Sequence, residues 1–163
     1  MVGIGSGGIG NIGTSSSCGD IIISGGTVTA TGGQYGAGIG SGSSYNSGHS
    51  SCGEITISGG TVEANGGQFG AGIGSGLFGK FASISITDGI TSVTATAGYA
   101  EYNGTSTAEP IGKGYDDDGS GSVSIDGSTS WTAGTATTHL NWDASTFKFI
   151  YNCTVTRWTL THK

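Results

Sequence analysis

The sequence predicts an all-β protein, a parallel β-solenoid, and three observations lead to this fold class. Residues 18–42 and 52–76 are near-copies that match at 20 of 25 positions and lie 34 residues apart. A fixed period of this length is typical of repeat architectures. Each copy contains short segments in which apolar and polar residues alternate, as in half-buried strands. Glycine-rich stretches separate these segments and favour sharp turns between them.

The second copy defines one coil of three short strands. Strands are expected at 54–58, 61–64 and 71–74, with turns at 59–60 and 65–67. Alternation along each strand points every second side chain inward. The inward side chains would be Ile55, Ile57, Val62, Ala64, Ala71 and Ile73. Parallel crossovers are usually right-handed, which favours a right-handed coil.

The same template fits about four coils in total. The inward residues of the others are Ile21, Ile23, Val28, Ala30, Ala37 and Ile39; then Ile84, Ile86, Val93, Ala95 and Ile111; then Val123, Ile125, Trp131 and Ala133. Stacked coils lie roughly 4.8 Å apart, so equivalent side chains should form ladders and make a narrow core. A helical fold is disfavoured because apolar residues do not recur at helical spacing. A propeller blade needs about 40 residues and four antiparallel strands, which fits less well.

The two ends depart from the template. Residues 3–7 match the third strand of a coil whose first two strands are missing, with Ile4 equivalent to Ile39. Such an open end exposes strand edges. We expect either a piece of a longer array or a second subunit that completes the end through Val2 and Ile4.

The last segment changes in composition, which divides the chain into solenoid repeats at 1–136 and a C-terminal strand or cap at 137–163. This segment contains few glycines and two of the three tryptophans. Its apolar residues alternate on two faces, as expected of a strand. Either it caps the last coil, or it adds as a strand to another chain. The residues for such end-to-end assembly would be Phe147, Phe149, Tyr151 and Trp158.

Composition excludes several classes of partner. The chain carries 11 acidic and 5 basic residues, for a net charge of −6, so no nucleic-acid partner is expected. Apolar runs are too short for a membrane span. The first ten residues lack the basic and apolar regions of a signal peptide.

Cys18 and Cys52 occupy equivalent positions of the two copies. Stacking would place their Cα atoms about one coil apart, which lies inside the disulfide range of about 4.4–6.8 Å. The pair is therefore a candidate disulfide, with stacked free thiols as the alternative. Phe81 stands near this position in the next coil, and no histidine pattern accompanies Cys153, so zinc is not expected.

Asp116, Asp117 and Asp118 form the strongest acidic cluster. Adjacent carboxylates supply the oxygen ligands that Ca²⁺ prefers, so a calcium site is one interpretation. The spacing differs from that of an EF-hand loop. A solvated acidic turn is the alternative, and no other cofactor is expected.

Aromatic and loop residues supply the candidate ligand contacts. Tyr35 and Phe69 are equivalent and should stack at a corner, either as a structural ladder or as a platform for sugar rings. Insertions between coils often form the binding edge of a solenoid. The candidate binding residues in them are Tyr45, His49, Tyr99, Tyr102 and Tyr115.

The outward positions of the second strands are rich in threonine. They include Thr27, Thr29, Thr61 and Thr94, with Glu63 as an interruption. A regular array of threonines on a flat sheet could order water, so an ice-binding solenoid is one alternative. The other interpretation is that threonine suits exposed strand positions.

Catalysis is not expected. No sequence motif pairs a histidine with a serine or cysteine nucleophile, and Arg157 is the single arginine. Gly48-His49-Ser50 lacks the second glycine of the Gly-His-Gly turn that β-helical hydrolases of carbohydrates use. An enzyme would need a base within reach of its reacting group.

The repeat ISGGTVxAxGGxxGAGIGSG, read at 23–42 and 57–76, resembles the glycine-rich repeats of bacterial surface and secreted proteins, some called carbohydrate-binding domain-containing proteins. The resemblance implies a secreted or cell-surface location and an adhesive or glycan-binding use. We therefore expect a non-enzymatic structural or adhesive solenoid whose partner is a polysaccharide or a cell-surface polymer. A filament or phage-fibre subunit that binds copies of itself is the other alternative.

Overall fold

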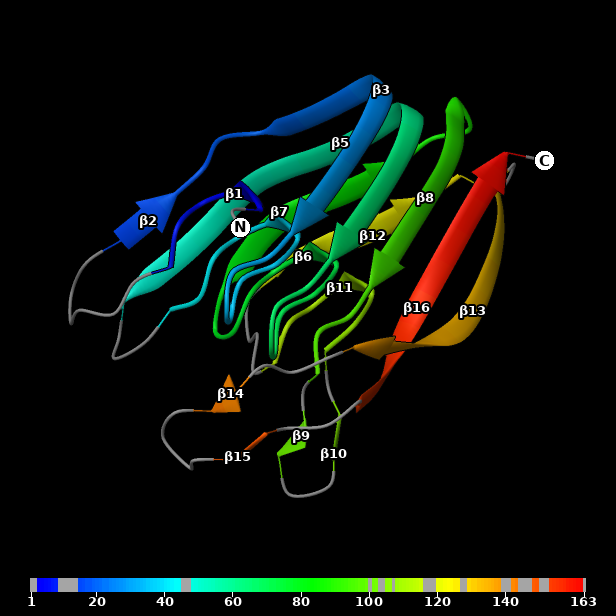
Figure 1. The fold of residues 1–163 in the computed structure, drawn as a ribbon. Helices are drawn as coiled ribbons and strands as arrows, with labels where there is room; N and C mark the ends of the chain where they lie inside the picture. Colours follow the sequence, from blue (N-terminus) through cyan, green and yellow to red (C-terminus); the bar gives the residue numbers. More distant parts are fainter. Residues whose placement is uncertain are drawn as a thin grey trace.

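The computed structural model describes residues 3–8, 15–44, 48–99, 101–102, 105–106, 108–115, 120–126, 129–138, 142–143, 148–149 and 153–162. Every regular element in these ranges is a β-strand (Figure 1). The strands are β1 (Ile4–Gly5), β2 (Ser15–Ser17), β3 (Ile21–Thr31), β4 (Ile39–Gly40), β5 (His49–Asn65), β6 (Ile73–Gly74), β7 (Lys80–Ile86), β8 (Ile90–Thr96), β9 (Glu101–Tyr102), β10 (Thr105–Ser106), β11 (Ile111–Gly112), β12 (Ser122–Ile125), β13 (Thr129–Thr138), β14 (Trp142–Asp143), β15 (Lys148–Phe149) and β16 (Cys153–His162). Within the described ranges there is no helix that could cross a membrane.

Most strands stack in parallel and in the predicted register. Ile21 pairs with Ile55, Ile55 with Ile84, and Ile84 with Val123 along β3, β5, β7 and β12. Val28, Val62 and Val93 pair in the same way farther along β3, β5 and β8. The ladders that the repeat predicts are therefore confirmed, and the all-β, mostly parallel arrangement is that of a β-solenoid.

The third strands form a separate four-stranded sheet in the order β1-β4-β6-β11. Ile4 pairs with Ile39, Ile39 with Ile73, and Ile73 with Ile111, all in parallel. The equivalence of Ile4 with the later isoleucines is thus confirmed. Successive copies of the same strand lie side by side in Figure 1.

The core is the apolar interior of this stack. Its fully buried side chains include Ile39, Ile55, Ile57, Val62, Ile73, Ile84, Ile86, Val93, Ile111 and Leu160. Burial falls off toward both ends of the ladders, where Ile4 is 39% exposed and Val123 is 38% exposed. A terminal rung contacts one neighbouring rung, so it buries less apolar surface than an inner rung.

The glycines are needed at the first predicted corner and also inside the third strands. The first corner is not a break between strands, because β3 and β5 run through it with a shift in register. Gly26 and Gly60 turn the chain there with φ of 81° and 83°. A second column of positive φ lies inside the third strands, at Gly40 (133°) and Gly74 (137°).

The C-terminal strand takes a place that the sequence assigned to another segment. We predicted that Trp131 and Ala133 would stack on the second strand of the preceding coil, and this is wrong. Instead β16 pairs with β8 in antiparallel register, with Leu160 opposite Val93. β13, which carries Trp131, pairs with the far edge of β16, also antiparallel. Figure 1 shows β16 and β13 beside β8.

The segment before Cys52 also differs from the prediction. It was expected to be a loop, but β5 begins at His49 and pairs in parallel with β2. Ser15 lies opposite His49, and Ser17 lies opposite Ser51. His49, Ser50 and Ser51 are polar, so no alternation of apolar and polar residues reveals a strand before Cys52.

The glycine column gives a stability prediction. A Cβ added at Gly74 would overlap the carbonyl oxygen of Gly112 on the next rung, at a φ that side chains avoid. Gly74→Ala should therefore destabilise the fold by roughly 2–4 kcal/mol, through strain and overpacking together. Urea unfolding followed by circular dichroism measures the change.

Gly25→Ala is the matched control, because a Cβ at Gly25 would meet nothing within 4 Å. It should shift the urea midpoint little. Equal midpoints for the two variants would contradict the role assigned to the column.

Candidate functional site

Four aromatic side chains, which we call the aromatic cluster, gather beside the third strands. They are Tyr35, Phe69, Phe78 and Tyr115. Tyr35 and Phe69 lie in the equivalent turns that follow β3 and β5, whereas Phe78 and Tyr115 follow β6 and β11. Stacking of the rungs brings these turns together along one edge of the solenoid.

The rings of the cluster are in mutual contact. Tyr35 and Phe69 stack with centroids 6.2 Å apart and planes at 29°. Phe69 and Tyr115 meet edge to face at 5.3 Å, and Phe78 and Tyr115 at 6.5 Å. Separations and angles of this kind are the favourable ones for aromatic pairs. The predicted pairing of Tyr35 with Phe69 is therefore present, and it belongs to a larger group.

Backbone hydrogen bonds hold the cluster in place. The Tyr115 amide donates to the Phe69 carbonyl at 2.8 Å, and the Phe78 amide donates to the Tyr115 carbonyl at 3.1 Å. The Phe69 amide donates in turn to the Tyr99 carbonyl at 2.9 Å. These bonds link turns from different rungs, so the rings are fixed relative to one another.

Two members of the cluster adopt a backbone conformation that aromatic residues avoid. Phe69 has φ of 63° and Phe78 has φ of 54°. A bulky residue in the left-handed region is an outlier, and each such residue costs about 1–3 kcal/mol. Phe78 is 40% exposed, so the partial burial of its ring is worth about 1–2 kcal/mol, an amount similar to this strain. Strain of this kind concentrates at functional sites.

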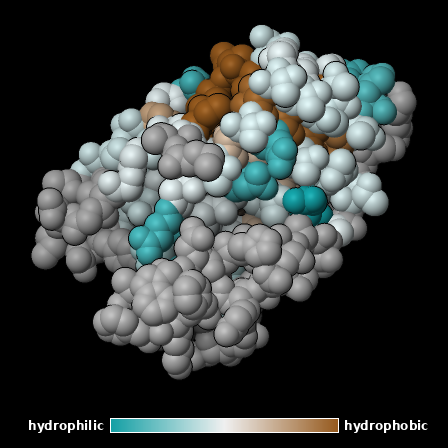
Figure 2. Space-filling view, viewed as in Figure 1, coloured by the Kyte–Doolittle hydropathy of each residue, from teal (hydrophilic) through white to brown (hydrophobic). Residues whose placement is uncertain are grey.

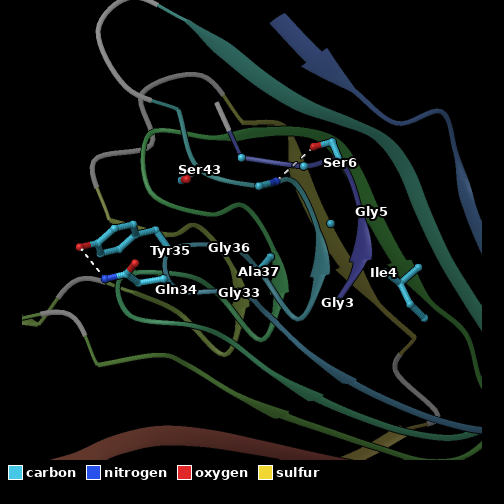
Figure 3. Close-up of a pocket in the computed structure, with 14 residues that line it drawn as sticks. Gly3, Ile4, Gly5, Ser6, Gly33, Gln34, Tyr35, Gly36, Ala37 and Ser43 are labelled. Atoms are coloured by element: carbon cyan, nitrogen blue, oxygen red, sulfur yellow. Dashed lines mark hydrogen bonds between the residues drawn. The ribbon is translucent and has the colours of Figure 1, made fainter. Parts of the chain in front are cut away.

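A hollow of about 380 Å³ lies next to the cluster, at the first rung. It is lined by Gly3, Ile4, Gly5, Ser6, Gly7, Gly8, Gly33, Gln34, Tyr35, Gly36, Ala37, Gly40, Gly42 and Ser43. Figure 3 shows Gln34 donating through Nε2 to the Tyr35 hydroxyl, at 3.1 Å. Because Tyr35 lines the hollow and stacks on Phe69, the hollow and the aromatic cluster are continuous.

The structure brings together only part of the predicted binding set. Tyr115 lies in the cluster, and Tyr99 contributes a carbonyl group to it. His49 is exposed on β5, and Tyr102 is in β9 opposite Thr105. Tyr45 lies outside the described residues.

Sequence reasoning missed Phe78. Its equivalent in the first copy is Ser44, so comparison of the copies gives no aromatic signal at this position. The one sign in the sequence was the apolar pair Leu77-Phe78, which stands between Gly76 and Gly79.

The residues predicted for calcium binding and for assembly are only partly described. Asp116, Asp117, Asp118, Val2, Phe147 and Tyr151 lie outside the described residues. Ile4 is in β1, which pairs on one side with β4. Phe149 is in β15, and Trp158 in β16 packs against the main core. The described ranges hold no group of three or more potential metal ligands.

The outward face of the second strands forms a second candidate surface. One row of register positions is Thr27, Thr61, Ser92, Thr161 and Ser130, and the next row is Thr29, Glu63, Thr94, Thr159 and Thr132. The sequence placed β13 directly after β8, but β16 inserts Thr159 and Thr161 between them. Hydroxyl positions thus continue across five neighbouring strands.

The two cysteines of the repeat are in contact. The Cys18 thiol donates to Cys52 Sγ at 2.6 Å. Cys52 is buried in the main core, and Cys18 is half-buried against it. Burial raises the pKa of the Cys52 thiol from 9.0 to about 12, and the neighbouring Cys18 thiol adds to the rise.

Comparison with known proteins supports the repeat. A family model described as a beta helix repeat matches residues 21–43 and 55–77, which overlap most of the two near-copies. No curated protein and no solved structure matches the chain. The match agrees with a β-solenoid and carries no information on a ligand.

The raised pKa of Cys52 predicts a pH dependence for the reduced protein. The folded thiol stays neutral up to about pH 12, whereas the unfolded thiol ionises above about pH 9. Its contribution to stability is therefore complete below pH 9 and is lost as the pH rises toward 12. Urea unfolding under reducing conditions, at about pH 8 and about pH 10.5, measures the loss.

Cys52→Ala removes the titrating group, so the variant should lose less stability between these two pH values than the natural protein. An identical loss in both proteins would contradict the assignment.

Proposed function

We propose that this chain is a non-enzymatic, extracellular β-solenoid that binds a polysaccharide through the aromatic cluster and the adjoining hollow. The observation that carries the proposal is the exposed, strained Phe78 ring, held edge to face against Tyr115. A fold that needed aromatic rings only for stability would gain little from a strained ring that is 40% exposed.

The chemistry of the surface suits a sugar polymer. Apolar faces of sugar rings pack on aromatic rings, and ligand sites combine such apolar walls with a few fixed polar groups. The hollow offers Ser6, Gln34 and Ser43 beside Tyr35. The cluster extends from this hollow over turns of successive rungs, which suits an extended chain better than a small molecule.

The same residues support a binding role rather than a catalytic one. The lining of the hollow and the four cluster residues include only glycine, alanine, isoleucine, serine, glutamine, phenylalanine and tyrosine. Histidine, aspartate, glutamate, lysine and cysteine, which often serve as general acids and bases, are absent from this set of residues. General acid–base chemistry at this site would therefore need a group from elsewhere.

Phe78→Ala tests the proposal. Loss of one stacked ring should weaken retention on the recognised polysaccharide about tenfold. Alanine keeps a Cβ and therefore the backbone strain at this position, so the free energy of unfolding should fall by only about 1 kcal/mol, because the lost ring is 40% exposed. A panel of soluble and insoluble glycans, with and without Ca²⁺, identifies the ligand, and calorimetry measures its affinity. Phe78→Tyr should keep most of the affinity.

The matched control is Ile22→Ala, which removes an apolar side chain that is 71% exposed on β3. Figure 2 shows apolar surface over this part of the fold. Equal affinity for Phe78→Ala and Ile22→Ala would rule out the aromatic cluster as the binding surface.

The hydroxyl rows on the second strands favour one further candidate, the ordering of water at an ice surface. Hydroxyls repeat about 4.8 Å apart across strands and about 6.7 Å along them, so they form a regular grid. Glu63 is the one charged side chain among these positions. On this proposal Glu63→Thr should strengthen suppression of ice growth, and Thr94→Tyr should abolish it.

Thermal hysteresis and ice recrystallisation provide the measurements. Ser85→Tyr is the control, because Ser85 lies on β7, outside the rows, opposite Thr56. Absence of ice-growth suppression in the natural protein, or an equal effect of Ser85→Tyr, would contradict this candidate.

A further inference from the structure

Backbone register places Cys18 and Cys52 side by side. Upstream, Ser17 pairs with Ser51, and downstream, Ile21 pairs with Ile55, so the offset is the same on both sides of the cysteines. The Cys18 amide also donates to the Ser51 carbonyl at 3.1 Å. Neighbouring parallel strands lie about 4.8 Å apart, which is within the Cα separation of about 4.4–6.8 Å found in disulfides.

The side chains face each other as well. The Cys18 thiol donates to Cys52 Sγ, and both cysteines pack at the main core. The next rung carries Phe81 opposite Cys52, so the cysteine ladder has two members and forms one pair.

We propose that an oxidising environment joins Cys18 and Cys52 in a disulfide. This bridge fastens β3, which is the first rung of the β3-β5 ladder, to β5. β3 pairs only with β5 among the described strands, and its Ile22 is 71% exposed. In a stack whose stability is a sum over neighbours, a rung with one neighbour opens first. The bridge would hold this rung covalently.

The oxidant is a small-molecule disulfide such as oxidised glutathione. The half-buried Cys18 is the accessible thiol, so its thiolate attacks the small disulfide and releases one thiol. The Cys52 sulfur then attacks Cys18 Sγ in the mixed disulfide and releases the second thiol. The two protons lost by the cysteines pass to the two released thiols, so one small disulfide is reduced for each bridge formed.

Peptide mapping of the natural chain tests the bridge directly. Cleavage before aspartate cuts at Asp20, Asp88 and Asp143, which places Cys18, Cys52 and Cys153 in three different peptides. The folded protein is incubated with oxidised glutathione, its remaining thiols are alkylated, and it is denatured and digested. We expect the peptides of Cys18 and Cys52 to be linked, and Cys153 to be alkylated.

Alkylation of Cys18 and Cys52 in the oxidised sample, or a link from either one to Cys153, would overturn the proposal. The test needs no variant, so it does not depend on whether a substituted chain folds.

Hydrogen exchange tests the effect on the first rung. Oxidation should slow exchange of the β3 amides by about tenfold or more relative to the reduced protein, because opening of this rung is suppressed. The Cys18→Ala, Cys52→Ala double variant should exchange at one rate with or without oxidant. Equal β3 exchange in the oxidised and reduced natural protein would overturn the role in holding the rung.

Discussion

The structure depends on one constraint, which is that equivalent residues of successive coils stack in parallel, in register, at the spacing of backbone hydrogen bonds. A side chain at one position therefore meets its own equivalent above and below. Isoleucine stacks on isoleucine at Ile39, Ile73 and Ile111, and all three side chains are buried. The core is narrow, so its stability comes from the number of such layers rather than from their width.

The same constraint explains the glycine column, the cysteine pair and the aromatic cluster. At Gly40 and Gly74 the backbones of adjacent rungs approach so closely that a Cβ would overlap the next carbonyl oxygen. Cys18 meets Cys52, and Tyr35 meets Phe69, because the members of each pair stand at the same step of successive coils. Phe78 and Tyr115 join the aromatic pair from the turns after β6 and β11, and Phe78 is both exposed and strained.

The repeat made most of the solenoid predictable. Register followed from the two near-copies, and Ile84, Val93 and Ile111 could be placed by the same alternation of apolar residues. The position of β16 could not be predicted, because Val93 can be covered equally well by a parallel or an antiparallel neighbour. The sequence of either candidate strand alternates in the same way, so periodicity does not choose between them. One member of the aromatic cluster was likewise hidden, since Phe78 has no aromatic equivalent in the first copy.

The antiparallel docking of β16 has a consequence for how this fold can change in length. Among the described strands that stack in parallel, β16 pairs only with β8, β1 only with β4, and β3 only with β5. Duplication of one 34-residue unit in the middle of the stack would leave these pairings intact, provided that the new unit kept its glycine at the position of Gly74. Proteins that gain or lose such units would form solenoids of graded height in which the contacts of β3 and β16 stay constant.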